Sequence, residues 1–174
     1  MTGTVFVALL AGHWIGDHWV QTDHQATGKG GHGWAGRSAC AAHVATLTLC
    51  QMIALALVAA TVGEGFSALQ AALGLGINAV THYWADRRHT FQGLAAVLGK
   101  GGYYDRGGAP HLDLAWHMGW LLPVALIITS PTTGSALLLS GISMAALFGL
   151  AQLARVGRSL PHKRDGVYVI LRNN

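Results

Sequence analysis

The sequence predicts an all-α polytopic membrane protein, on the strength of three observations. Only 10% of the 174 residues are charged and 52% are hydrophobic, whereas soluble domains carry about 25% charged residues. Apolar stretches of about 20 residues, the length needed to cross a bilayer, recur along the chain. The 11 Lys and Arg residues fall only in alternate connections and in the C-terminal tail. An unusually apolar soluble helical protein is the alternative.

Five spanning helices are expected, and the first and third are the least apolar because they hold polar residues. They cover residues 4–21, 38–62, 66–86, 112–129 and 135–154. Residues 1–154 would form a transmembrane helical bundle, and residues 155–174 a basic cytoplasmic tail. Within the long third connection, residues 90–98 are expected to form a short helix at the membrane interface.

The basic residues set the predicted orientation, because Lys and Arg mark the cytoplasmic side of membrane proteins. Two lie in the first connection, four in the third and five in the tail, and none lies in the second or fourth. This pattern predicts an N-terminus outside and a C-terminus in the cytoplasm. Four spans would instead move the five basic residues of the tail outside.

Composition also indicates where in the cell the protein lies and what it binds. The basic residues are dispersed among loops, so the net charge of +4 does not indicate nucleic-acid binding. The many Ala and Gly residues favour a bacterial source, which places the chain in the cytoplasmic (inner) membrane as a multi-pass protein. The lipid bilayer is the expected partner, and homo-oligomerisation is left open. Cys40 and Cys50 lie ten residues apart in one predicted helix, roughly 15 Å, which is too far for a disulfide.

Three histidine–aspartate pairs lie inside the predicted spans at helical spacing. They are His13 with Asp17, His82 with Asp86, and Asp113 with His117. Residues four apart share one face of a helix, and an ionisable group costs roughly 2.5–3.5 kcal/mol at the centre of a membrane helix. His43 and the three pairs all lie within roughly 12 Å of the cytoplasmic ends of their predicted helices. We therefore expect them to meet at one site.

Imidazole and carboxylate side chains together are typical ligands of Zn²⁺, Mn²⁺ or Fe²⁺. The predicted metal ligands are His13, Asp17, His82, Asp86, Asp113 and His117. Three clustered carboxylates repel one another and need a counter-charge. With more candidates than the four positions of a tetrahedral zinc, either two metals bind or some aspartates orient the ligating histidines. Zinc is the best single choice because histidine dominates the set. The alternative without metal is that the pairs simply hydrogen-bond within and between helices.

Further polar residues extend two of the pairs into polar stripes along one helix face. Gln21 follows Asp17, and Gln70 and Asn78 precede His82. His18 is left out because it lies about 140° around the helix from His13. The glycine-rich segment around Lys29 lacks the Walker A spacing, so no phosphate site is assigned to it.

The combined pattern resembles a bacterial and phage membrane family known as domain of unknown function 3307. The residues that carry the likeness are His13-xxx-Asp17-xxx-Gln21, then Lys29, His43, His82-xxx-Asp86 and Asp113-xxx-His117. The likeness covers roughly residues 5–122 and implies a short helical bundle. Here His18 replaces an apolar residue and Leu114 replaces a Gln of the usual pattern. The resemblance supports the site and implies no particular reaction.

The leading functional prediction is a membrane-embedded metal-dependent hydrolase with a membrane-proximal or lipid-linked substrate. A divalent metal would activate water as the nucleophile, with His13, His82 and His117 among its ligands. Asp17 or Asp86 would act as general base, and His43 would protonate the leaving group. One alternative is a transporter or binding protein for divalent metal or protons. Another is a structural membrane protein whose bundle is held together by metal.

Overall fold

The computed structural model describes residues 1–63, 65–164 and 167–170, and five long helices dominate it. They are α1 (Thr2–Ile15), α3 (Gly33–Val62), α4 (Ala68–Asp86), α7 (Ala109–Ile128) and α8 (Thr133–Ser159). Short helical pieces join them: η1 (Gly16–Val20), α2 (Asp23–Gly28), α5 (His89–Val97), α6 (Gly101–Tyr103) and η2 (Tyr104–Gly108). A small antiparallel hairpin of β1 (Pro161–Arg164) and β2 (Val167–Ile170) follows. The prediction of a helical protein is confirmed, although the hairpin was not foreseen.

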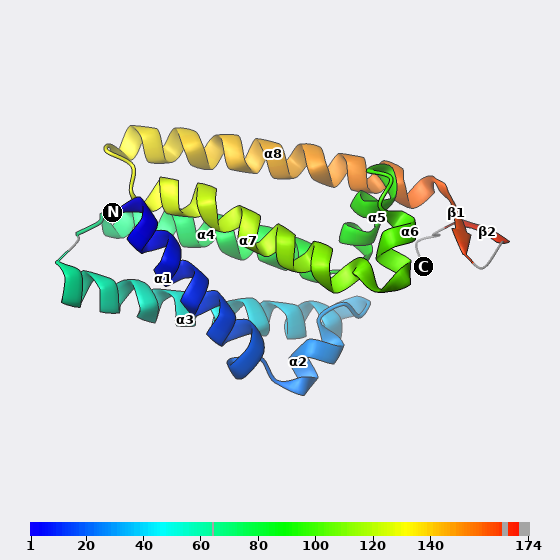
Figure 1. Ribbon diagram of the computed structural model, residues 1–174, viewed down its shortest axis with the longest axis horizontal. Helices are drawn as coiled ribbons and strands as arrows, with labels where there is room; N and C mark the ends of the chain where they lie inside the picture. The colour runs from blue at the N-terminus through cyan, green and yellow to red at the C-terminus, as the bar shows by residue number, and fades with distance from the viewer. Residues whose placement is uncertain (64, 165–166, 171–174) are drawn as a thin grey trace.

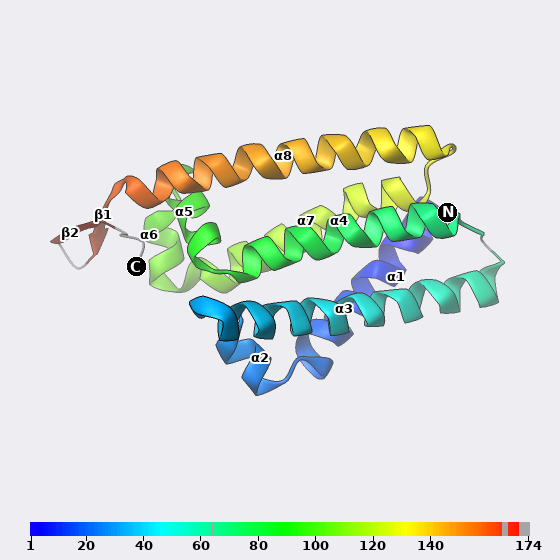
Figure 2. The same ribbon diagram turned by 180° about the vertical axis from the view of Figure 1, so that it is seen from behind.

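The long helices run roughly alongside one another in three tiers. The α4–α7 pair lies between α8 on one side and α1 with α3 on the other (Figures 1 and 2). Because successive long helices alternate in direction, the ends of α1 and α4 lie toward the same end of the bundle as the starts of α3 and α7. The polar pairs occupy this end, and α8 packs at the periphery as expected.

Three of the helical segments are long and apolar enough to cross a membrane: Gly33–Val62, Gly101–Ile128 and Thr133–Ser159. The two long helices outside this set, α1 and α4, correspond to the predicted spans that hold the most polar residues. Large apolar side chains also stand exposed on the outer faces of α3 and α8, among them Leu49, Ile53, Leu57, Leu138, Ile142 and Phe148. Such apolar surface indicates a lipid environment or a protein partner.

Several boundaries differ from the sequence-based expectation. Helix α3 begins at Gly33 instead of residue 38, which places His43 roughly 15 Å from the helix start. The last turns of α8 include residues 155–159, so part of the predicted tail is helical. The short helix predicted at 90–98 is confirmed as α5.

The end of the first helix departs from regular α geometry. Residues 16–20 form the π-helical segment η1, and the helix stops there because Gln21 adopts an extended backbone with ψ 125°. The predicted continuation of the polar stripe from Asp17 to Gln21 is therefore wrong. π-helical turns are rare and often lie at functional sites, and this one carries Asp17.

Two glycines bring α1 unusually close to α3. A Cβ atom added to Gly12 would lie 2.7 Å from the Cα of Gln51, and one added to Gly16 would lie 2.9 Å from the Cα of Leu47. Only glycine fits at such a distance, and a small residue every four positions is the usual device for close helix packing in membranes. The following residues, His13 and Asp17, are thereby brought against α3.

The apolar core fills the other end of the bundle, around the second half of α7. Leu9, Leu55, Leu121, Val124 and Ile128 are among its fully or almost fully buried members. At Gly74 of α4 the packing is so tight that an added Cβ would lie 2.6 Å from a side-chain carbon of Ile128. The interior of the bundle is therefore polar at one end and apolar at the other.

Candidate metal centre

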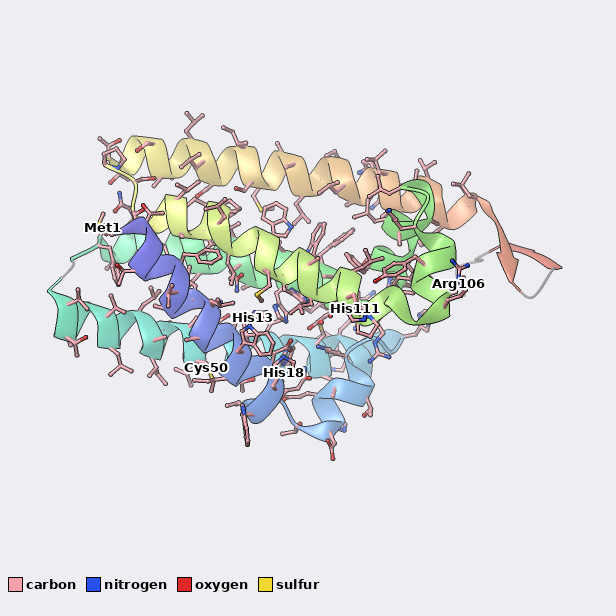
Figure 3. All side chains as sticks on the ribbon, in the orientation of Figure 1. Met1, His13, His18, Cys50, Arg106 and His111 are labelled. Carbon is pink, nitrogen blue, oxygen red and sulfur yellow. The ribbon has the colours of Figure 1, made fainter. Side chains whose placement is uncertain are left out.

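The seven ionisable residues predicted from the sequence converge at one place. Four helical segments supply them: α1 with η1, α3, α4 and α7. Contacts of 3.1–3.9 Å between side-chain nitrogens and oxygens link the members in one chain: His13, Asp17, His43, His82, Asp86, His117 and Asp113. The four imidazole rings and Asp86 are almost completely buried. Figure 3 shows His13 near the end of α1, where that helix meets the rest of the bundle.

Three donor atoms form a nearly equilateral triangle at the centre of the cluster. His43 Nε2 lies 3.1 Å from His82 Nε2 and 3.4 Å from Asp86 Oδ2, and His82 Nε2 lies 3.2 Å from Asp86 Oδ2. Ligands about 2.0–2.1 Å from a tetrahedral zinc ion lie roughly 3.3 Å from one another. The triangle therefore has the dimensions of one face of a zinc coordination shell.

Hydrogen bonding accounts for only one of these three distances, the one between His43 Nε2 and His82 Nε2. Within the described part of the chain, Asp86 Oδ2 has no hydrogen-bond partner, although two imidazole nitrogens lie near it. Both ring nitrogens of His13 and the Nε2 atom of His117 likewise lack partners among the described residues. Buried polar atoms are almost always satisfied, so these atoms are candidate donors to a metal ion. Imidazole and carboxylate donors at this spacing fit a divalent transition metal.

The Asp17 carboxylate lies beside this triangle. Its Oδ1 atom lies 3.2 Å from His43 Nε2, and donor atoms of Asp17, His43 and His82 all lie within 4.8 Å of one another. A second group of that size joins His82, Asp86 and His117. The geometry thus fits His43 as a metal ligand, whereas the sequence pattern suggested a role in proton transfer.

Lys29 enters the cluster from the loop after α2, and sequence reasoning missed this contact. Its Nζ atom lies 2.9 Å from Asp86 Oδ1 and 3.8 Å from Asp17 Oδ1. Asp86 therefore presents Oδ1 to Lys29 and Oδ2 to His43 and His82. Lys29 was noticed in the sequence only as part of a glycine-rich loop and of the family resemblance, and neither signal identified its partner.

His13, His117 and Asp113 surround the triangle. The ring of His117 stacks on that of His82 with centroids 3.9 Å apart, and the His13 ring lies 5.3 Å from the His82 ring. The Asp113 carboxylate lies 3.5 Å from His117 Nε2, and its side chain is 38% exposed. Asp113 therefore marks the opening of the site. His18 is exposed on the outside of η1, in agreement with its exclusion.

A buried amide pair forms the floor of the site. Asn78 donates a hydrogen bond of 2.8 Å to Gln51 Oε1, and Gln51 in turn donates to the carbonyl of Leu9 at 3.3 Å. Asn78 was recognised in the sequence, but Gln51 was not, because no polar stripe on its own helix marks it. These bonds tie α4, α3 and α1 together directly below the histidines.

Two consecutive arginines, Arg87 and Arg88, donate hydrogen bonds to the segment that contains Lys29. Arg87, which is buried, donates hydrogen bonds to the carbonyls of Lys29 at 2.6 Å and Gly31 at 2.5 Å. Arg88 donates to the carbonyl of Ala26 at 3.0 Å. The C-terminal end of α4 thus binds the loop in two ways. Arg87 binds the backbone carbonyls of the loop, and Asp86 binds the side chain of Lys29.

A cavity of about 390 Å³ opens beside the cluster. Lys29, Asp86 and Asp113 line it on the side of the metal centre, and α5, η2 and the start of α7 supply the remaining wall. The carboxylates at the site therefore border a space that can admit a small molecule.

Comparisons of the chain with protein families, with curated proteins and with solved structures found no match.

Proposed function

We propose that this protein is a multi-pass membrane metalloprotein that hydrolyses a membrane-proximal or lipid-linked substrate at its cytoplasmic face. The observation that carries the proposal is the triangle of His43 Nε2, His82 Nε2 and Asp86 Oδ2, with edges of 3.1–3.4 Å and an acceptor that lacks a hydrogen bond among the described residues. Zinc is the preferred ion because histidines predominate, with manganese and iron as alternatives.

The charge of the cluster supports a single divalent ion. Asp17, Asp86 and Asp113 contribute three negative charges, and the Lys29 ammonium balances one of them. With neutral imidazoles, the remaining two charges match one divalent cation. The Lys29 ammonium also lies on Asp86 Oδ1, the oxygen that a second metal would need.

The proposed topology has five spans, with the N-terminus outside and the C-terminus in the cytoplasm of a bacterial inner membrane. Met1 and Arg106 lie at opposite ends of the molecule (Figure 3), which agrees with the one-sided distribution of basic residues. Trp19 and Trp34 stand 86% and 81% exposed near the site end, where aromatic anchors are typical of membrane interfaces. This topology opens the cavity toward the cytoplasmic leaflet.

Hydrolysis fits the site better than transport does. A transport path would have to continue from the floor at Asn78 through the other half of the bundle, which Val124, Ile128 and neighbouring apolar side chains fill. A metal at the triangle would supply Lewis acidity and an activated water. Asp17, with a 15% exposed side chain, lies where a carboxylate could accept the proton of that water. His117 and Asp113 border the route by which a substrate arrives.

We also propose membership of the family known as domain of unknown function 3307. The support is that eight of the nine residues that carry the resemblance lie in or beside the cluster: His13, Asp17, Lys29, His43, His82, Asp86, Asp113 and His117. Residues that define a sequence pattern and also meet in space are expected to share one function.

The test combines metal analysis with a hydrolysis assay on the full chain in lipid nanodiscs. Elemental analysis should find about one zinc, manganese or iron ion per chain, and a bacterial polar lipid extract should yield hydrolysis products that depend on that metal. His43→Ala, His82→Ala and Asp86→Asn should each lose both metal and products. His18→Ala removes an exposed imidazole two residues from the π-helical segment's start and should retain both.

Two results would overturn the proposal. If the wild-type protein binds none of the three metals, the cluster is a hydrogen-bonded packing device. If metal binds but no lipid component is hydrolysed at any metal loading, the protein is a metal-binding protein without hydrolase activity.

A further inference from the structure

The cavity beside the metal centre has a second charged wall. Besides Asp86 and Asp113, its lining includes the side chains of Lys29 and Arg88, which come from the loop after α2 and from the corner between α4 and α5. Lys29 serves as a counter-charge in the metal centre, but Arg88 has no role there. The role of this arginine therefore needs a separate explanation.

Arg88 is held in a backbone conformation that arginine rarely adopts. Its φ of 50° makes it the only non-glycine residue with positive φ among the described residues. Such a conformation persists where surrounding structure enforces it, and it concentrates at functional sites. Here it lies at the turn from α4 into α5, directly after Asp86 and Arg87. The strained turn aims an arginine at the cavity next to the metal centre.

Gly30 leaves room for the side chain of Arg88. A Cβ atom added to Gly30 would lie 2.7 Å from Cδ of Arg88, so only glycine lets the arginine stem lie across the loop. One guanidinium nitrogen then donates to the carbonyl of Ala26. Arg88 is exposed to the cavity side of the molecule while its stem is fixed, which is the arrangement of an anion-binding arginine.

The rest of the lining defines the kind of anion. Tyr104 contributes a phenol, and Phe91, Ala109 and Pro110 give the wall an apolar part. The volume of about 390 Å³ suits a small headgroup. A guanidinium, an ammonium and a divalent ion together match the several oxygens and the negative charge of a phosphate ester. An apolar wall accommodates the uncharged part of the same molecule.

We infer that this cavity binds the phosphate ester of the substrate, with Arg88 and Lys29 as the residues that recognise the phosphate. This inference deepens the proposed function, on which it rests, by naming the substrate class. The phosphate ester comes either from a lipid headgroup or from a soluble metabolite, and both sources present the same chemistry to Arg88. The site differs from a Walker A loop because side chains, and not a cradle of backbone amides, hold the phosphate.

The experiment measures binding and does not depend on turnover. The full chain, loaded with zinc in phosphatidylcholine nanodiscs, is titrated with glycerol 3-phosphate by calorimetry. In a second arm the nanodiscs contain phosphatidic acid, and its enrichment around the protein is quantified by mass spectrometry. Arg88→Gln should weaken binding at least about tenfold, which is the usual effect of losing a charge-assisted hydrogen bond. Arg106→Gln removes an equal charge from an exposed residue of η2 outside the lining and should change binding less than about twofold.

The two arms identify the source of the phosphate ester. Binding of phosphatidic acid alone assigns the site to lipid, and binding of glycerol 3-phosphate alone assigns it to a soluble compound; either result supports the inference when it depends on Arg88. Equal losses in the two arginine variants would show nonspecific attraction and overturn the inference. Unchanged binding in Arg88→Gln would overturn it too.

Zinc content, measured on the same samples, separates this inference from the proposed function. Full zinc content without binding of either phosphate compound overturns the phosphate site alone. Phosphate binding that depends on Arg88 in protein that holds no metal supports the phosphate site and counts against the metal-dependent hydrolase.

Discussion

The Lys29 ammonium lies 2.9 Å from Asp86 Oδ1, and the Asp86 side chain is only 1% exposed. The other carboxylate oxygen of Asp86 faces His43 and His82. One buried carboxylate therefore joins a permanent cation on one side to the proposed metal position on the other. Because Arg87 also holds the carbonyl of Lys29, the ammonium is presented to the site by a loop with a defined position.

Lys29→Met should destabilise the metal-free protein. The substitution preserves an apolar stem but leaves Asp86 buried without its closest cation, and breaking a buried ion pair costs about 3–5 kcal/mol. The melting temperature in detergent should fall, and added zinc should raise it more in the variant than in the wild type because the site has gained negative charge. Lys100→Met, at an exposed loop position, is the control. An unchanged melting temperature in Lys29→Met would show that the pair does not stabilise the fold.

Metal removal should lower the stability of the wild-type protein. A ligand present at 100 times its dissociation constant adds about 2.7 kcal/mol to the free energy of unfolding, or roughly 5–10 °C in melting temperature for a chain of this size. Chelated protein resupplied with zinc, manganese or iron should recover that difference. His82→Ala should abolish the recovery and His18→Ala should preserve it. If none of the three metals shifts the wild-type melting temperature, the histidines and aspartates are packing residues.

The sequence predicted those parts of the site that depend on local periodicity. His13 with Asp17, His82 with Asp86 and Asp113 with His117 were recognisable because four-residue spacing places both members on one helix face. His43 was found from its expected depth in the membrane. The helical class followed from composition and from the apolar stretches of about 20 residues, which is the length of a membrane-spanning helix.

The contacts that were missed depend on tertiary structure. Lys29 and Asp86 are 57 residues apart, and Arg87 binds carbonyls of the same distant loop. No periodic signal connects a loop residue to a helix end. The π-helical turn at Asp17 also has no sequence signature, so Gln21 was wrongly placed on the helix. The early start of α3 was missed because its first turn, with Gly33 and Gly36, has a weak intrinsic preference for helix.

Arg87→Lys should loosen the loop that carries Lys29. A lysine cannot reproduce the two parallel hydrogen bonds that the planar guanidinium donates to Lys29 and Gly31. Amide hydrogens of residues 29–32 should exchange at least about tenfold faster, because each lost bond to a charged donor contributes about 1.5–3 kcal/mol. Arg37→Lys, at an exposed position of α3, should leave exchange in this loop unchanged. Equal protection in wild type and Arg87→Lys would show that other contacts order the loop.

The C-terminus should lie in the cytoplasm. The reason is that the connections and the tail on the site side hold all 11 basic residues, and such segments are retained on the cytoplasmic side. Reporter fusions that are active only in one compartment should give a cytoplasmic signal after residue 174 and an external signal in the connection between α7 and α8. A C-terminal reporter active outside would contradict both the topology and the cytoplasmic position of the cavity.

Gly12→Leu should separate α1 from α3 and thereby impair the metal centre. A Cβ at this position would lie 2.7 Å from the Cα of Gln51, so the helices must move apart. Overpacking of this kind costs about 1–3 kcal/mol. The displacement would carry His13 and Asp17 away from His43 and His82, so metal content should fall together with the melting temperature. Gly3→Leu introduces the same side chain into the same helix where a Cβ would have no atom within 4 Å, and it should preserve both properties. If Gly12→Leu retains full metal content, the close approach of α1 to α3 is not what assembles the site.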